Sequence, residues 1–239
     1  MAYRLLRSAI LGAVFGMTAA IAADPPAGAK TAKEALAPMQ GWVGSWKATG
    51  TIDGTVEEKQ AGLWSETQQW AWNFADPASP KLKWTVKDGK HAQGGEVRFR
   101  PDPGDFVLTL ETPDKKKLEY NGTLIVGKQK EVILTVERTV NDEQLERLTF
   151  TQLHPNRTLV RCEIRPIAGK QYIKKYQIGA TKEGEAFAKT GKGNECIVSG
   201  GRGTIPVTHK GTTYYVCCSG CKDAFLEDPD KWISAAKKP

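Results

Sequence analysis

Between Val43 and about residue 179 the chain consists of short runs in which apolar and polar residues alternate, as in residues 132–138 and 145–151. Alternation with a period of two places the apolar side chains on one face of a β-strand. Turn-forming pairs such as Asp53-Gly54, Asp88-Gly89 and Asn121-Gly122 separate the runs. We expect a first strand over 43–52 and further strands near 60–75, 81–87, 94–100, 105–111, 116–126, 130–138, 144–153, 158–165 and 171–179. Regularly spaced antiparallel strands joined by tight turns predict a meander that closes into a barrel or a sandwich.

The first of these strands carries the sequence Gly44-Ser45-Trp46. It resembles the G-x-W motif of lipocalin-like, or calycin, β-barrels. The resemblance implies that Trp46 plugs the closed end of the barrel under an arginine from a late strand, either Arg161 or Arg165. It also implies an interior that can hold a small apolar ligand. We therefore predict a mainly β fold with an antiparallel, calycin-like barrel over residues 41–180.

Four further residues of this region have an ordinary structural interpretation. Trp70 and Trp72 share one face of a strand, which favours a place in the core over a ligand pocket. His154 belongs to the turn-forming sequence His-Pro-Asn-Arg, so we expect it at the surface rather than as a haem ligand. Cys162 lies in a strand and is expected to be a small buried hydrophobe.

The last fifth of the chain contains a cysteine pattern, Cys196-x20-Cys217-x3-Cys221, with Cys218 directly after Cys217. Thiolates favour soft ions such as zinc or copper(I), whereas magnesium and calcium prefer oxygen ligands. A segment of this size buries little core and usually needs a metal or a disulfide to fold. The pattern therefore indicates a metal site or a disulfide framework.

The aromatic pair before these cysteines, Tyr214-Tyr215, and the segment from Phe225 to Trp232 add to the pattern. Together with the cysteine spacing they resemble the YHS/TRASH domain. The resemblance implies a small, treble-clef-like α+β module over residues 194–239 that binds heavy metals, with Cys196, Cys217 and Cys221 as ligands. Ile197 replaces the proline that often follows the first family cysteine, and the fourth ligand is left open.

Several alternatives remain for the cysteines. Trigonal copper(I) needs only three sulfurs, whereas tetrahedral zinc needs a fourth donor from Cys218, His209 or water. Structural disulfides are an alternative in an oxidising compartment. Cys218 and Cys221 also form a C-x-x-C pair, although no thioredoxin-like βαβ pattern surrounds it.

The N-terminus predicts export. Two arginines, Arg4 and Arg7, precede an apolar run that ends in small residues, which is typical of a signal peptide over residues 1–23. The run is too short to span a membrane comfortably, so the mature protein is expected to be periplasmic or secreted and not membrane-spanning.

Residues 24–40 are expected to form a linker and a short helix, and residues 181–193 a second linker. In the terminal module we expect a helix over 222–227 and, after Asp228-Pro229, a final short turn.

Charge and motifs narrow the function further. The formal net charge is +7, and removal of a signal peptide with two arginines leaves about +5. The lysines are scattered, with no recognition helix, which argues against nucleic-acid binding. The sequence has no G-x-S-x-G, H-E-x-x-H or phosphate-binding loop, so an enzyme is the least favoured class.

The sequence predicts an exported protein that binds zinc or copper for metal handling or sensing. The alternative is a lipocalin-like carrier whose C-terminal module is stapled by disulfides or zinc.

Overall fold

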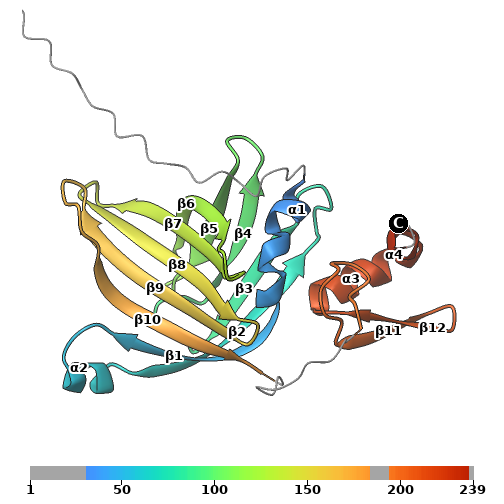
Figure 1. The fold of residues 1–239 in the computed structure, drawn as a ribbon, viewed down its shortest axis with the longest axis horizontal. Helices are drawn as coiled ribbons and strands as arrows, with labels where there is room; N and C mark the ends of the chain where they lie inside the picture. The colour runs from blue at the N-terminus through green and yellow to red at the C-terminus, as the bar shows by residue number, and fades with distance from the viewer. Residues whose placement is uncertain (1–30, 184–193, 237–239) are drawn as a thin grey trace, which may run out of the picture.

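The fold is described by a computed structural model, which covers residues 31–183 and 194–236. Ten antiparallel strands form a closed barrel in which each strand pairs with its neighbour in sequence and β1 pairs with β10 (Figure 1). The strands are β1 (Gly44–Ile52), β2 (Trp64–Asn73), β3 (Lys81–Lys87), β4 (Gly94–Arg100), β5 (Asp105–Glu111), β6 (Lys117–Val126), β7 (Val132–Val140), β8 (Gln144–His154), β9 (Arg157–Pro166) and β10 (Ile173–Lys182). The predicted mainly β, antiparallel barrel is therefore confirmed.

One predicted turn is wrong. Asn121-Gly122 lies inside β6, where Gly122 faces Val136 of β7 and Phe106 of β5. A Cβ atom at Gly122 would come within 1.9 Å of the Thr135 carbonyl oxygen. The glycine thus allows a close approach of two strands rather than a reversal of the chain.

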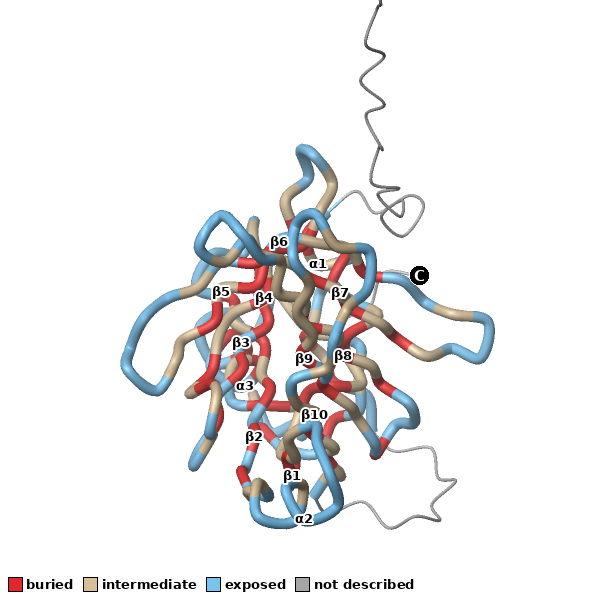
Figure 2. Tube along the Cα trace, turned by 90° about the vertical axis from the view of Figure 1, so that its left-hand side faces the viewer, coloured by how far each residue is buried: buried red, intermediate tan, exposed pale blue. Residues whose placement is uncertain are grey.

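Alternation places the core inside the barrel, where the buried positions of Figure 2 recur along each strand. Trp70 and Trp72 are buried, as predicted, and so is Cys162. His154 is exposed, and its Nδ1 lies 2.6 Å from the Asn156 Oδ1. These residues therefore have the structural places that their sequence context predicts.

A short helix and a 3-10 turn close one end of the barrel, here called the α1 end. Helix α1 (Ala32–Leu36) begins with a capping box between Thr31 and Glu34, and η1 (Ala37–Trp42) follows it. Leu36 is completely buried. Trp42 lies edge-on to Trp70, with 5.2 Å between ring centroids. Apolar packing therefore seals this end.

Trp46 is buried at the α1 end, as predicted, with 1% of its surface exposed. Its Nε1 donates a 2.7 Å hydrogen bond to the Trp42 carbonyl oxygen. The cation over its ring is Lys182 of β10, whose Nζ lies 5.3 Å from the ring centroid. The predicted partners, Arg161 and Arg165, are wrong because strand alternation turns them to the outer face, where Arg161 is exposed and Arg165 bonds carbonyls of the next turn.

The opposite end of the barrel, here called the α2 end, carries a helix that was not predicted. Helix α2 (Val56–Ala61) occupies the start of the segment expected as a strand over 60–75, and β2 begins only at Trp64. A capping box between Thr55 and Glu58 starts the helix, and this T-x-x-E pattern is the sequence signal that could have revealed it. No residue of α2 is buried, so the helix does not seal this end.

The C-terminal segment forms a hairpin and two helices: β11 (Ile205–His209), β12 (Thr212–Val216), α3 (Ser219–Glu227) and α4 (Pro229–Ala236). The final turn expected after Asp228 is wrong, because Pro229 begins α4, a position at which its missing N–H has no helical acceptor. The module lies beside the α1 end (Figure 1), and its buried residues belong to the same hydrophobic cluster as the barrel core.

The predicted signal peptide over 1–23, the first residues of the linker over 24–40 and most of the linker over 181–193 lie outside the described residues. Among the described residues, no helix combines the length and the apolar character needed to cross a membrane.

Candidate metal centre

Three short elements bring the cysteines together. Cys196 lies in a segment that runs beside β12, where it forms a bridge with Tyr215. Cys217 directly follows β12, and Cys221 lies in the first turn of α3. The change from strand to helix between residues 217 and 221 turns both side chains toward Cys196. The C-x20-C-x3-C spacing therefore corresponds to one hairpin followed by one helical turn.

The sulfur atoms of Cys196, Cys217 and Cys221 all lie within 4.8 Å of one another. Cys217 Sγ and Cys221 Sγ approach to 3.4 Å. Cys196 and Cys221 are 1% and 0% exposed, and Cys217 is partly exposed. Sulfurs bound to one zinc ion at about 2.3 Å lie about 3.8 Å apart in a tetrahedron. The three thiols are thus close enough together to hold a metal ion.

Ser199 contacts two of the three cysteine sulfurs, and it was not predicted from the sequence. Its backbone N–H donates to Cys196 Sγ at 3.4 Å, and its Oγ lies 3.3 Å from Cys217 Sγ. The amide three residues after a ligand cysteine can stabilise a thiolate. The turn-forming sequence Cys196-Ile-Val-Ser-Gly is the signal that could have shown it.

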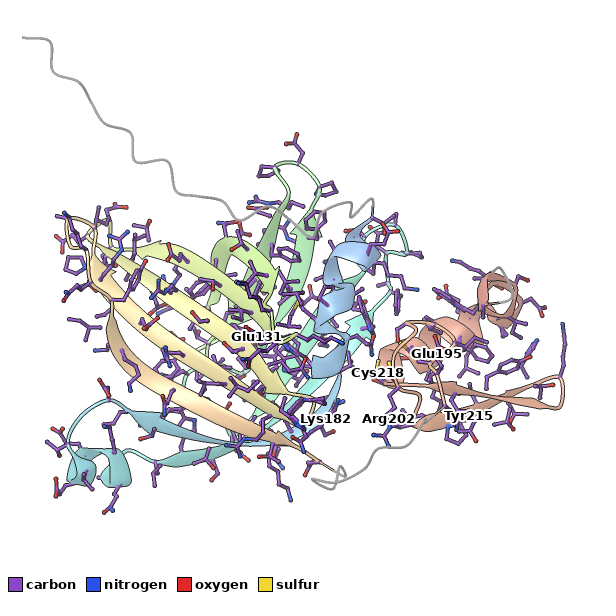
Figure 3. The ribbon with its side chains drawn as sticks, in the orientation of Figure 1. Glu131, Lys182, Glu195, Arg202, Tyr215 and Cys218 are labelled. Atoms are coloured by element: carbon purple, nitrogen blue, oxygen red, sulfur yellow. The ribbon has the colours of Figure 1, made fainter. Side chains whose placement is uncertain are left out.

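Cys218 is not part of the group of three, although its sulfur lies 3.8 Å from that of Cys217. It is 2% exposed, and Figure 3 shows it on the side of the module that faces the barrel. Contacts with Cys217 and Cys221, and then the backbone N–H of Trp72 in β2, lower the pKa of its thiol. Cys218 therefore joins the module to the barrel.

His209, the other predicted fourth donor, lies at the far end of the hairpin. Its Nε2 is 3.4 Å from Asp230 Oδ1, and its ring is edge-on to Phe225. His209 is also outside the group of three sulfurs. The structure thus brings together three of the five predicted donors.

Contacts among the thiols shift their pKa values in opposite directions. Hydrogen bonding with Cys196 is the main cause that lowers the pKa of Cys217, and hydrogen bonding with Cys217 lowers the pKa of Cys218. The same kind of contact, first with Cys196, raises the pKa of Cys221 well above its usual range. Buried thiols this close together cannot all ionise without a cation, so a bound metal ion would release protons.

The contact between Cys218 and Trp72 follows from the end of the β1–β2 ladder. That ladder stops at the pair Gly44 and Trp70, so β1 does not pair with Trp72. The N–H of Trp72 faces the sulfur of Cys218, and the Trp72 carbonyl oxygen faces Gly220 of α3. The terminal module therefore covers the exposed edge of β2, an edge that would otherwise be free to pair with other chains.

This contact predicts that Gly220→Ala separates the module from the barrel, because a Cβ atom there would lie 1.6 Å from the Trp72 carbonyl oxygen. We expect the Trp72 amide to exchange its hydrogen roughly tenfold faster or more, since an opened contact exposes it to solvent. Hydrogen exchange followed by mass spectrometry measures this. Gly179→Ala is the control, because a Cβ atom at Gly179 would meet no other atom within 4 Å. Unchanged protection in the Gly220 variant would contradict the contact.

No protein-family model matches this chain, and no curated protein is significantly similar to it.

Proposed function

We propose that this chain is an exported protein that binds one soft metal ion, zinc or copper(I), through Cys196, Cys217 and Cys221. The observation that carries the proposal is the convergence of these three sulfurs within 4.8 Å in a largely buried position. Thiolate ligands select zinc and copper(I) over harder ions. The N–H of Ser199 adds a donor that stabilises the negative charge of the bound cysteines.

The site is proposed as a three-sulfur site. Cys218 is held by the Trp72 amide, so its recruitment to the metal would break the contact with the barrel. Copper(I) is satisfied by three sulfurs, and zinc takes water as a fourth ligand beside the partly exposed Cys217. An open position of this kind suits an ion that is delivered and released rather than one locked permanently into the fold.

The biological role that we propose is metal handling or sensing in the periplasm or outside the cell. The signal-peptide pattern over residues 1–23 supports export. The resemblance of the last segment to the YHS/TRASH domain supports a treble-clef-like metal module, and Gly44-Ser45-Trp46 supports a lipocalin-like barrel. On this proposal the barrel carries the metal module, and α3 of the module packs on the edge of β2.

A carrier function is the second candidate. It is favoured by the closed barrel, one end of which α2 does not seal, and in this case the cysteines only staple the C-terminal module itself. Zinc would then be structural, or the cysteines would be oxidised in pairs. The two functions differ in whether the metal can be exchanged while the barrel stays folded.

The test is native mass spectrometry of the reduced, full-length mature protein after addition of zinc or copper(I). We expect one ion per chain and a release of protons on binding. Chelation should remove the ion while the strand signal in circular dichroism persists. Cysteines that are oxidised in pairs in the native exported protein, with no metal bound after reduction, would contradict the proposal and support the structural alternative.

A further inference from the structure

The interior of the barrel at the α2 end contains a network of charged and phenolic groups. Tyr120 of β6 donates a 2.5 Å hydrogen bond to Glu146 Oε1 of β8. Arg138 Nε of β7 donates to the same oxygen at 2.9 Å. Both bonds go to Oε1, which leaves Oε2 without a hydrogen-bond donor among the described residues. The side chains of Glu146 and Arg138 are each 21% exposed, so solvent reaches this network.

A second carboxylate lies deeper on β2. Glu66 is only 6% exposed, and both of its oxygens accept hydrogen bonds from neutral groups. The donors are Trp64 Nε1 at 2.8 Å and Gln68 Nε2 at 2.6 Å. Burial of a carboxylate without a cationic partner is unfavourable by several kcal/mol on general grounds. Glu66 has no salt bridge to a described residue, so a structural role alone does not explain its place.

Aromatic rings lie near both carboxylates, since Trp64 bonds Glu66 and the charge of Glu146 acts on His91. The rings of His91 and Tyr176 are stacked, with 3.9 Å between centroids and 3° between planes. Trp64 meets both rings edge-on, at 5.1 Å and 6.1 Å. Among the described residues, His91 Nε2 is a buried polar atom without a hydrogen-bond partner. Burial, followed by the charge of Lys90, lowers the pKa of His91, so the imidazole is neutral at pH 7.

Charged groups of both signs meet at this interior. Two carboxylates, Glu66 and Glu146, share it with the guanidinium of Arg138, and Lys90 lies at its edge. The face of Trp64 already attracts a cation, because the exposed Lys90 places its Nζ 5.1 Å from the ring centroid. Aromatic faces and carboxylates together form the usual environment for organic cations in proteins.

We propose that the α2 end of the barrel binds a small organic cation, a primary ammonium carried on a flat apolar body. The ammonium pairs with the unoccupied Oε2 of Glu146, and the apolar body packs against Trp64 and Tyr176. The metal centre lies beyond the α1 end, so this site is separate from it. The proposal does not depend on metal binding.

Three small molecules of similar shape, benzylamine, benzyl alcohol and benzoate, test on the full mature chain whether binding requires a positive charge on the ligand. We expect saturable one-site binding of benzylamine, which isothermal titration calorimetry measures. Benzyl alcohol and benzoate should bind at least roughly tenfold more weakly, because they lack the ammonium that forms a charge-assisted bond. Equal or tighter binding of either, or no saturable binding of benzylamine, would overturn the proposal.

A matched pair of variants then locates the site. Glu146→Gln should weaken benzylamine binding by roughly tenfold or more, since the amide cannot pair with the charge. Glu119→Gln is the control, because Glu119 precedes Tyr120 on β6 and faces the outside, where its side chain is 53% exposed. It should bind benzylamine as the parent does. Folded Glu146→Gln protein that binds benzylamine with the affinity of the parent would overturn the assignment of Glu146, and the three-probe comparison holds whether or not this variant folds.

Discussion

Replacement of Cys221 with serine is expected to weaken zinc or copper(I) binding by roughly 100- to 1,000-fold. The total binding free energy of a structural zinc site is about 10–16 kcal/mol. Divided evenly among four ligands, this means that the loss of one thiolate removes about 3–4 kcal/mol. Cys221 is completely buried, and its sulfur lies 3.4 Å from that of Cys217. Serine preserves the shape of the side chain and removes only the soft ligand. Competition with a chromophoric chelator measures the change in affinity.

Two other cysteines are the controls for this experiment. Cys162→Ser should leave the affinity unchanged, because Cys162 is in the barrel and burial raises the pKa of its thiol to about 12. Cys218→Ser should change the affinity only a few-fold if the site has three sulfurs. A loss in Cys218→Ser as large as that in Cys221→Ser would show that zinc is held by four sulfurs. Tight binding by Cys221→Ser would refute the proposed centre.

Replacement of Trp46 with alanine is expected to lower the free energy of unfolding by about 3–5 kcal/mol, the usual loss when a buried aromatic side chain is removed. Trp46 is 1% exposed. The variant loses the bond from Nε1 to the Trp42 carbonyl oxygen and leaves a cavity below Lys182. Urea unfolding followed by far-ultraviolet circular dichroism measures the difference.

Trp46→Phe is the matched control. It keeps an aromatic ring in the same place and loses only the indole N–H and part of the volume, so we expect a clearly smaller loss. If Trp46→Ala were as stable as Trp46→Phe, packing of Trp46 at the α1 end would not contribute to the stability of the barrel.

Most of the barrel could be predicted from local sequence. Alternation with a period of two identifies a strand without any knowledge of its neighbours, and turn-forming pairs such as Asp88-Gly89 mark its end. The same reasoning failed where a local pattern has two meanings. Asn121-Gly122 is a frequent turn pair, yet here a glycine is required because β6 and β7 approach closely at Thr135.

The candidate metal site was predictable to the same extent. The spacing of Cys196, Cys217 and Cys221 indicates which thiols can meet, because a hairpin and one helical turn have fixed dimensions. The spacing cannot say where Cys218 points. Its direction depends on the edge of β2 beyond Trp70, which exists only because β1 begins opposite that residue.

The sequence by itself thus determined the strands, their inward faces and the group of three cysteines, since each depends on residues near one another along the chain. The tertiary structure alone decided which groups meet across the barrel. Closure of β1 onto β10 placed Lys182, rather than Arg161 or Arg165, over Trp46. Closure also gathered Glu66 and Glu146 from strands far apart in sequence into one interior. These contacts across the barrel depend on the register of all ten strands together, and no local sequence pattern contains that information.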